Sequence, residues 1–73
     1  MALPTVDPAG TGANIERLRK ANGLTVRDLR ETLGVSAQAI HKWRVGAALP
    51  TVDNLVILAA LFGVRIDELL VTA

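Results

Sequence analysis

The sequence contains no cysteine, and it has only one histidine, one tryptophan and one phenylalanine. Without cysteine there is no disulfide framework, no thiolate nucleophile and no cysteine-ligated metal site. A zinc site with a single histidine would have to depend on carboxylates, so we expect neither a metal nor a cofactor. The sequence also offers no nucleophile–base pair and no glycine-rich phosphate loop, which argues against an enzyme.

Signals for secretion or membrane insertion are absent as well. The first ten residues have no basic segment and are interrupted by Pro4 and Pro8. The most apolar stretch, Leu55–Phe62, is far too short to span a bilayer. We therefore expect a cytoplasmic protein. Residues 1–11 lack hydrophobic periodicity and are expected to form a flexible N-terminal tail, which leaves 12–73 as the folded domain.

The remaining residues predict an all-α fold. A chain of 73 residues has room for one domain, and its core must be mainly aliphatic because 51% of the residues are hydrophobic but only 3% are aromatic. Helix start and stop signals predict five helices, at about 12–22, 26–33, 37–44, 52–62 and 66–71. Hydroxyl residues that can cap a helix precede the first four, at Thr11, Thr25, Ser36 and Thr51.

The segment from Thr25 to Gly46 is typical of a helix-turn-helix. Thr25 and Asp28 have the spacing of a capping box, and Ser36 stands directly before the second helix. Between the two helices, Gly34 can adopt the left-handed conformation that ends a helix. The connection is too short for an independent loop, so the helices are expected to pack at a steep angle.

The second helix of this pair is amphipathic. Ile40 and Trp43 fall on one side, and Gln38, His41 and Lys42 fall on the other. The polar side offers hydrogen-bond donors and no carboxylate, as a helix that enters a DNA major groove needs. A solvated surface helix that happens to be basic is the alternative interpretation. Trp43 is expected in the core, although an aromatic residue on a binding surface could stack on a base.

Charge is distributed unevenly along the sequence. The net charge is only +1, but residues 14–46 hold seven basic and three acidic residues, a net +4. The rest of the chain has one basic and four acidic residues, a net −3. The positive field therefore lies on the half that contains the helix-turn-helix, as phosphate binding requires.

The helix expected at 52–62 has an unusual composition, because every residue from Leu55 to Phe62 is apolar. A surface helix does not normally carry apolar residues all round. Part of this surface should therefore be covered by the helix at 66–71 or by a second subunit, and we expect a homodimer formed through these two helices.

The sequence resembles the lambda-repressor-like domains of the phage repressor and Cro (XRE-type) family of transcriptional regulators. The landmarks in register are Ile15, Leu18-Arg19, Gly23-Leu24-Thr25, Leu29, Leu33-Gly34-Val35-Ser36, Ile40, Lys42-Trp43, Gly46, Pro50-Thr51, Asn54-Leu55, Leu61-Phe62-Gly63-Val64 and Asp67-Glu68-Leu69-Leu70. The resemblance implies a compact five-helix domain that binds operator DNA as a two-fold dimer. It implies a sequence-specific regulator, which we expect to be a repressor.

The resemblance also suggests individual roles on double-stranded DNA. Base contacts are expected from Ala37, Gln38 and Lys42, with His41 close by. Gln38 can pair with adenine, Lys42 can reach guanine or a phosphate, and Ala37 can contact a thymine methyl. His41 is expected to contact a phosphate or water rather than a metal. Phosphate contacts are expected from Ser36, Arg44, Arg27, Thr25 and Lys20, with helix capping as the preferred role of Ser36.

Several positions depart from the family pattern. Family members often pair an arginine of the first helix with a glutamate near the end of the recognition helix, but here Arg44 stands at the glutamate position. Arg19 must then find Glu16, Glu31 or a backbone carbonyl, or Arg44 must turn toward phosphate. The loop at 47–49 carries no charged side chain. These departures favour a second hypothesis, a protein-interaction module such as an antitoxin or adaptor with weak DNA binding.

Overall fold

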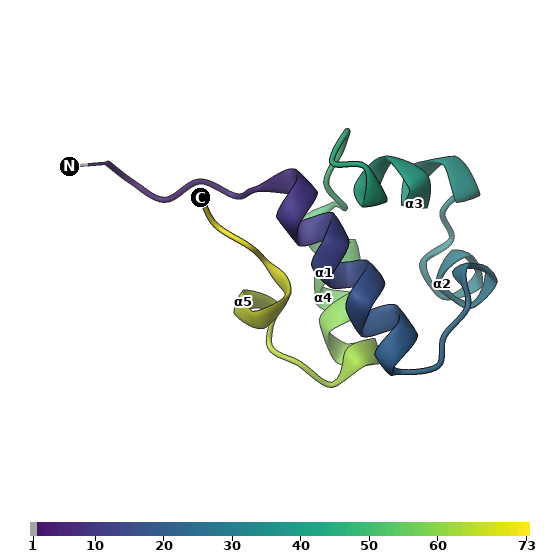
Figure 1. Ribbon diagram of the computed structural model, residues 1–73. Coiled ribbons are helices and arrows are strands. Elements are labelled where there is room, and N and C mark those ends of the chain that lie inside the picture. Colours follow the sequence, from purple (N-terminus) through teal and green to yellow (C-terminus); the bar gives the residue numbers. More distant parts are fainter. Residues whose placement is uncertain (1) are drawn as a thin grey trace.

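The computed structural model describes residues 2–73, and within that range the chain forms five α-helices (Figure 1). These are α1 (Pro8–Ala21), α2 (Val26–Leu33), α3 (Ala37–Arg44), α4 (Val52–Phe62) and α5 (Ile66–Leu69). The all-α prediction is confirmed, and the bounds of α2, α3 and α4 agree with those expected. None of the helices in residues 2–73 combines the length and apolar character that crossing a membrane requires.

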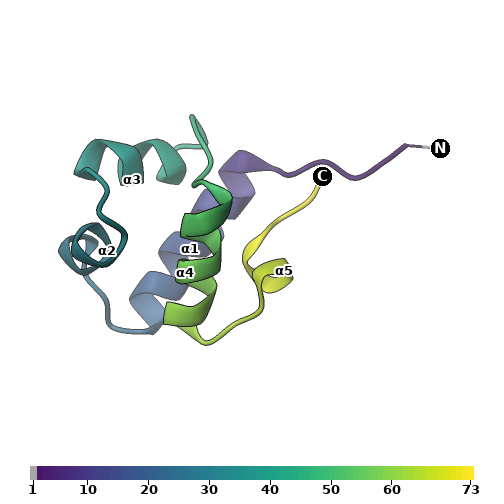
Figure 2. The same ribbon diagram turned by 180° about the vertical axis from the view of Figure 1, so that it is seen from behind.

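The helices surround one aliphatic core. In Figures 1 and 2, α1 and α4 cross at the centre, α2 and α3 lie together at one end, and α5 lies at the other side. Leu29 of α2, Leu58 of α4 and Leu69 of α5 have no exposed surface, so widely separated segments meet in the same cluster. The predicted core residues Ile40 and Trp43 are 2% and 4% exposed. Burial of these large side chains therefore fixes α3 on the domain.

Local capping accounts for the accuracy at α2 and α3. The Thr25 hydroxyl accepts from the backbone N–H of Asp28 at 3.0 Å, and the Asp28 carboxylate accepts from the N–H of Thr25 at 2.8 Å. The Ser36 hydroxyl accepts from the N–H of Ala39 at 3.1 Å. Gly34 ends α2 with φ +68°, as predicted. Each signal operates within four residues, so the sequence alone reveals it.

The predicted start of α1 is wrong. The helix begins at Pro8 rather than near Gly12, and its N-cap is Asp7, whose side chain accepts from the N–H of Gly10 at 3.1 Å. Residues 8–11, assigned from the sequence to an N-terminal tail, therefore belong to α1. Thr11 is fully buried instead of capping the helix.

The N-terminal segment pairs with the end of the chain. Val6 and Thr72 form an isolated antiparallel bridge, and the N–H of Asp7 donates to the carbonyl of Val71 at 2.7 Å. The Thr11 hydroxyl accepts from the N–H of Val71 at 2.9 Å. This pairing also corrects the prediction for α5, which ends at Leu69 rather than near Val71 because residues 71–73 run alongside residues 5–7.

Thr11→Val is expected to lower the free energy of unfolding by about 1–2 kcal/mol, because the isosteric change leaves the buried N–H of Val71 without an acceptor. Urea denaturation of the two proteins measures the difference. Thr32→Val, at an exposed position of α2, is the control and should change stability much less. Equal effects of the two substitutions would show that the buried hydroxyl does not hold the two ends of the chain together.

Candidate nucleic-acid interface

The outward face of α3 brings together the four residues expected to contact bases. Ala37, Gln38, His41 and Lys42 are all exposed, and they line one shallow hollow of about 550 Å³. Both views place α3 at the edge of the molecule, away from α4 and α5 (Figures 1 and 2). No residue of α3 carries a carboxylate. The face is therefore open to a partner that is rich in hydrogen-bond acceptors.

The start of α3 presents a second type of donor. Ser36 caps the helix, in agreement with its preferred role, and it is exposed. Because its oxygen accepts from Ala39, its hydroxyl proton remains free to donate. Thr25 is placed in the same way at the start of α2. Capping and a phosphate contact are therefore compatible at both positions.

The cationic residues expected at phosphates differ in their surroundings. Arg27 pairs with Glu31 at 2.9 Å on the exposed surface of α2, and Lys20 lies 3.8 Å from Glu16. Lys42 and Arg30 are exposed and have no ion-pair partner within residues 2–73. Exposed pairs are weak and easily exchanged. Lys42 and Arg30 are thus the cations that are most readily available, and the sequence had not ranked Arg30 among them.

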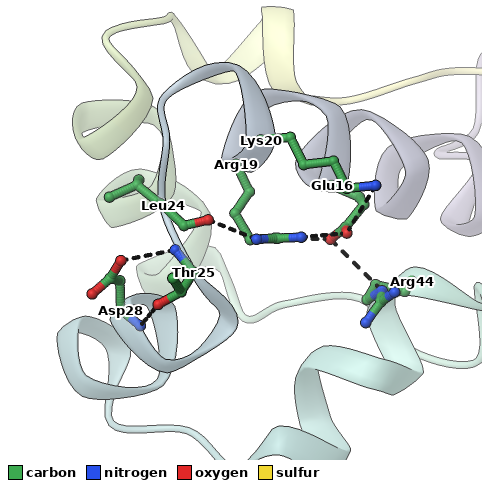
Figure 3. Close-up of polar contacts among 7 residues, drawn as sticks. All are labelled: Glu16, Arg19, Lys20, Leu24, Thr25, Asp28 and Arg44. Carbon is green, nitrogen blue, oxygen red and sulfur yellow. Dashed lines mark hydrogen bonds and ion pairs between the residues drawn. The ribbon is translucent and has the colours of Figure 1, made fainter.

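Glu16 joins α1 to α3 and was not expected to be a central residue (Figure 3). Its carboxylate accepts two hydrogen bonds from Arg19, at 2.6 and 3.1 Å, and one oxygen lies 3.6 Å from Nε of Arg44. Arg19 also donates to the carbonyl of Leu24 at 2.6 Å. Of the partners left open for Arg19, the structure therefore selects Glu16 and a backbone carbonyl. The ion pair between α1 and α3 persists with its charges exchanged between the helices.

The electrostatics of this cluster follow from its geometry. Hydrogen bonds from Arg19 hold the pKa of Glu16 below its ordinary value of 4.5, and the positive charges of Arg19, Arg44 and Lys20 act in the same direction. The same hydrogen bonds raise the pKa of Arg19. At the start of α2, hydrogen bonds from Thr25 lower the pKa of Asp28. Both carboxylates are therefore ionised more readily in the folded protein than in the unfolded chain.

These shifts predict an acid-sensitive fold. A carboxyl with a lowered folded pKa stabilises the protein above its unfolded pKa, and that contribution is lost as the pH falls through the folded value. Stability should therefore decline as the pH drops below about 4.5, the ordinary value for Glu16. Urea denaturation from pH 7 to pH 3 measures this decline, and Glu16→Gln should make it shallower. An unchanged pH dependence in that variant would contradict the role given to Glu16.

Other anchors of the site come from residues that the sequence did not single out. The side-chain amide of Asn14 donates to the carbonyls of Glu68 and Leu69, at 2.8 and 3.0 Å, and so ties α1 to α5. A Cβ atom at Gly12 would lie 1.7 Å from the carbonyl oxygen of Trp43. The backbones of α1 and α3 therefore approach so closely that only glycine fits. The three-residue spacing of Glu16 and Arg19 was the one local signal available.

Comparison with known proteins places this geometry in a family. A family model described as helix-turn-helix matches residues 15–69. The chain is 41% identical over 56 residues to the HTH-type transcriptional activator BcrR of Enterococcus faecalis, a match covering 77% of this chain and 28% of BcrR. It is 36% identical over 56 residues to the uncharacterized HTH-type transcriptional regulator YobD of Bacillus subtilis (strain 168), covering 77% of this chain and 50% of YobD. The chain thus spans between about a quarter and half of the length of these relatives.

Solved structures share the fold. The restriction-modification controller protein C.AhdI from Aeromonas hydrophila superposes with a TM-score of 0.74 at 24% identity, covering 86% of this chain and 96% of C.AhdI. The DNA-binding domain of BldD superposes with a TM-score of 0.71 at 27% identity, covering 89% of this chain and 94% of that domain. The family match, the five-helix fold and the outward face of α3 agree. The chain therefore belongs to the lambda-repressor-like (XRE-type) helix-turn-helix family of transcriptional regulators.

Proposed function

We propose that this protein binds operator DNA as a homodimer, reads the major groove with α3 and acts as a repressor. The observation that carries the proposal is the outward face of α3, where Ala37, Gln38, His41 and Lys42 are exposed above the buried side chains of Ile40 and Trp43. Base edges and phosphates are rich in acceptors, and this face offers donors without a competing carboxylate.

Each residue on this face has a distinct chemical role in the proposal. The Gln38 amide can both donate and accept, which matches the N6 and N7 edge of adenine. Lys42 lies one turn further along the same face and donates to guanine O6 or N7. Ala37 offers a methyl group to a thymine methyl. His41, between these positions, contacts a phosphate or a bound water.

Phosphate contacts come from the surrounding elements. The hydroxyls of Ser36 and Thr25 can donate to phosphate oxygens from the first turns of α3 and α2, where the helix dipole also favours an anion. Lys20, Arg27 and Arg44 each have a carboxylate neighbour in the free protein, so a phosphate has to replace that neighbour. These contacts add affinity without reading the sequence.

Repression is the simpler regulatory outcome for such a reader, because the bound protein only has to occupy DNA that polymerase needs. The word activator belongs to BcrR, of which this chain matches 28%. The sign of the regulation is measured by fusing the selected operator to a reporter gene. Lower reporter output in cells that express the protein is expected, and higher output would identify an activator.

The DNA-binding proposal is tested by retention on immobilised random duplex DNA over a series of salt concentrations. The protein should be retained at low salt and released steeply, since each phosphate contact contributes about −0.9 to the slope of log K against log salt. Lys42→Gln should elute earlier and reduce the slope. Arg65→Gln removes the same charge from the α5 end of the molecule and should elute with the unaltered protein.

The competing function gives a different elution pattern. A protein-interaction module on the same fold, such as an antitoxin or adaptor, would pass through the duplex column at low salt. It would also elute identically in the two variants. That result would reject DNA binding by α3.

Homodimerisation is supported by apolar side chains on α4 and α5. Val52 and Val56 are 72% and 55% exposed, and Ile57 and Ile66 are 39% and 37% exposed. A soluble domain seldom leaves a group of large apolar side chains in water, and such patches usually mark an interface. A two-fold dimer would also place two α3 helices on half-sites about 34 Å apart along the DNA.

Val56→Asp is expected to weaken the dimer by more than about tenfold, because the carboxylate would be buried at the interface without a partner. Sedimentation equilibrium measures the association. Operator affinity should fall with it, because a single half-site reader lacks half of the contacts. A protein that sediments as a monomer before substitution would reject this interface.

A further inference from the structure

Glu16 is approached by three basic side chains from two helices (Figure 3). Arg19 and Lys20 come from α1, and Arg44 comes from the last turn of α3. The Glu16 side chain is only 18% exposed, so its charge is partly shielded from water by these neighbours. One carboxylate therefore serves cations on both sides of the contact between α1 and α3.

The three cations are held with different strength. Arg19 donates two hydrogen bonds to Glu16 and a third to the carbonyl of Leu24, and its side chain is 13% exposed. Arg44 has a single contact with Glu16 at 3.6 Å, which is longer than a hydrogen bond, and its side chain is 46% exposed. Arg19 is thus a fixed structural partner, whereas Arg44 is held mainly by charge and has room to move.

Arg44 also borders the face that reads DNA. It lies three residues after His41, so the two side chains are neighbours on α3. Together with Glu16, Ala13 and Val45 they line a shallow hollow of about 380 Å³ between α1 and α3. A phosphate that follows the edge of α3 would compete with Glu16 for the guanidinium of Arg44, because both present paired oxygens.

We propose that Glu16 restrains Arg44 in the free protein and that a DNA phosphate displaces this carboxylate when the duplex binds. The inference rests on the proposed function, since it assigns a regulatory carboxylate to the same DNA-binding site. Glu16 is a positioning residue that lowers sequence-independent affinity. The contribution of Arg44 to binding is small while Glu16 is charged, and it becomes large once that charge is removed.

The test is a double-mutant cycle on random duplex DNA, measured over a series of salt concentrations. Glu16→Gln keeps an amide oxygen that can accept from Arg19 but removes the charge. It should raise affinity roughly fivefold at low salt and steepen the salt slope by about 0.9, which is one additional phosphate contact. Arg44→Gln should cost less than about twofold alone. In the Glu16→Gln background the same change should cancel the gain.

Asp67→Asn is the matched control, because it makes the same change in charge and releases Arg65 from its 3.1 Å ion pair on α5. It should leave affinity and slope unchanged, whereas a gain equal to that of Glu16→Gln would reduce the effect to net charge and overturn the inference. Equal costs of Arg44→Gln in both backgrounds would also overturn it. Failure of every protein, including the unaltered one, to bind duplex would instead overturn the proposed function and this inference with it.

A second measurement does not depend on the stability of the Glu16 variant. In the unaltered protein, the Nε–H resonance of Arg44 should shift on addition of duplex, while that of Arg19 should stay in place because its three hydrogen bonds persist. An unmoved Arg44 resonance in a protein whose backbone signals report DNA binding would contradict the displacement.

Discussion

Gly12→Ala is expected to lower the free energy of unfolding by about 3 kcal/mol, although alanine is the better helix former. The new Cβ would lie 1.7 Å from the carbonyl oxygen of Trp43 and 2.7 Å from its carbonyl carbon. Both atoms belong to the backbone, so no side-chain rotation can relieve the overlap. The helices α1 and α3 must separate, and the well-packed core beneath Trp43 opens with them.

Urea denaturation at neutral pH measures this change, and the sign of the result is informative. At an unconstrained helix position, glycine to alanine stabilises by roughly 0.5–1 kcal/mol. The matched control is Ala13→Gly, the next residue along α1, which is exposed and should be destabilising by only that amount. A Gly12→Ala variant as stable as the unaltered protein would show that α1 and α3 are not in close backbone contact.

Gln38→Ala combined with Lys42→Ala is expected to abolish the preference for the operator over random DNA. Both side chains are exposed on α3, so their removal leaves the core intact. Each base contact of this kind contributes about 1–3 kcal/mol of discrimination, so the double change should reduce specificity by a hundredfold or more. Fluorescence anisotropy against a site selected from a random pool, and against a scrambled site, measures the ratio.

The control for this experiment is the pair Asp53→Ala and Arg65→Ala, which lies outside α2 and α3 and also removes two exposed polar side chains. It should bind the selected site with unchanged preference. Circular dichroism should show equal helicity in both double variants. Retained preference in the α3 variant would reassign base reading to other residues.

The parts of the fold that were predictable depend on short-range chemistry. The bounds of α2 and α3 follow from the capping groups at Thr25 and Ser36 and from the left-handed turn at Gly34. The first turn of α1 was missed because Pro8–Gly12 is poor in helix-forming residues. That turn is held by Thr11 and Asp7, which bond to Val71 about sixty residues away. A local pattern does not reveal such a contact.

The candidate site divides in the same way. The helical period placed Ile40 and Trp43 inward and Gln38, His41 and Lys42 outward, and the structure confirms that arrangement. The period does not determine which of several partners a long side chain selects. The sequence therefore left Arg19 and Arg44 with alternatives, and tertiary packing between α1 and α3 brought both to Glu16.

The central claim, that a duplex lies against the outward face of α3, is tested most directly by titrating ¹⁵N-labelled protein with duplex DNA and following the backbone amide resonances. The account predicts that the largest shifts fall within residues 36–44, with smaller ones at the start of α2, and that α4 is little affected. Shifts confined to α4 and α5, or amides of α3 that stay in place when the protein binds DNA, would contradict it.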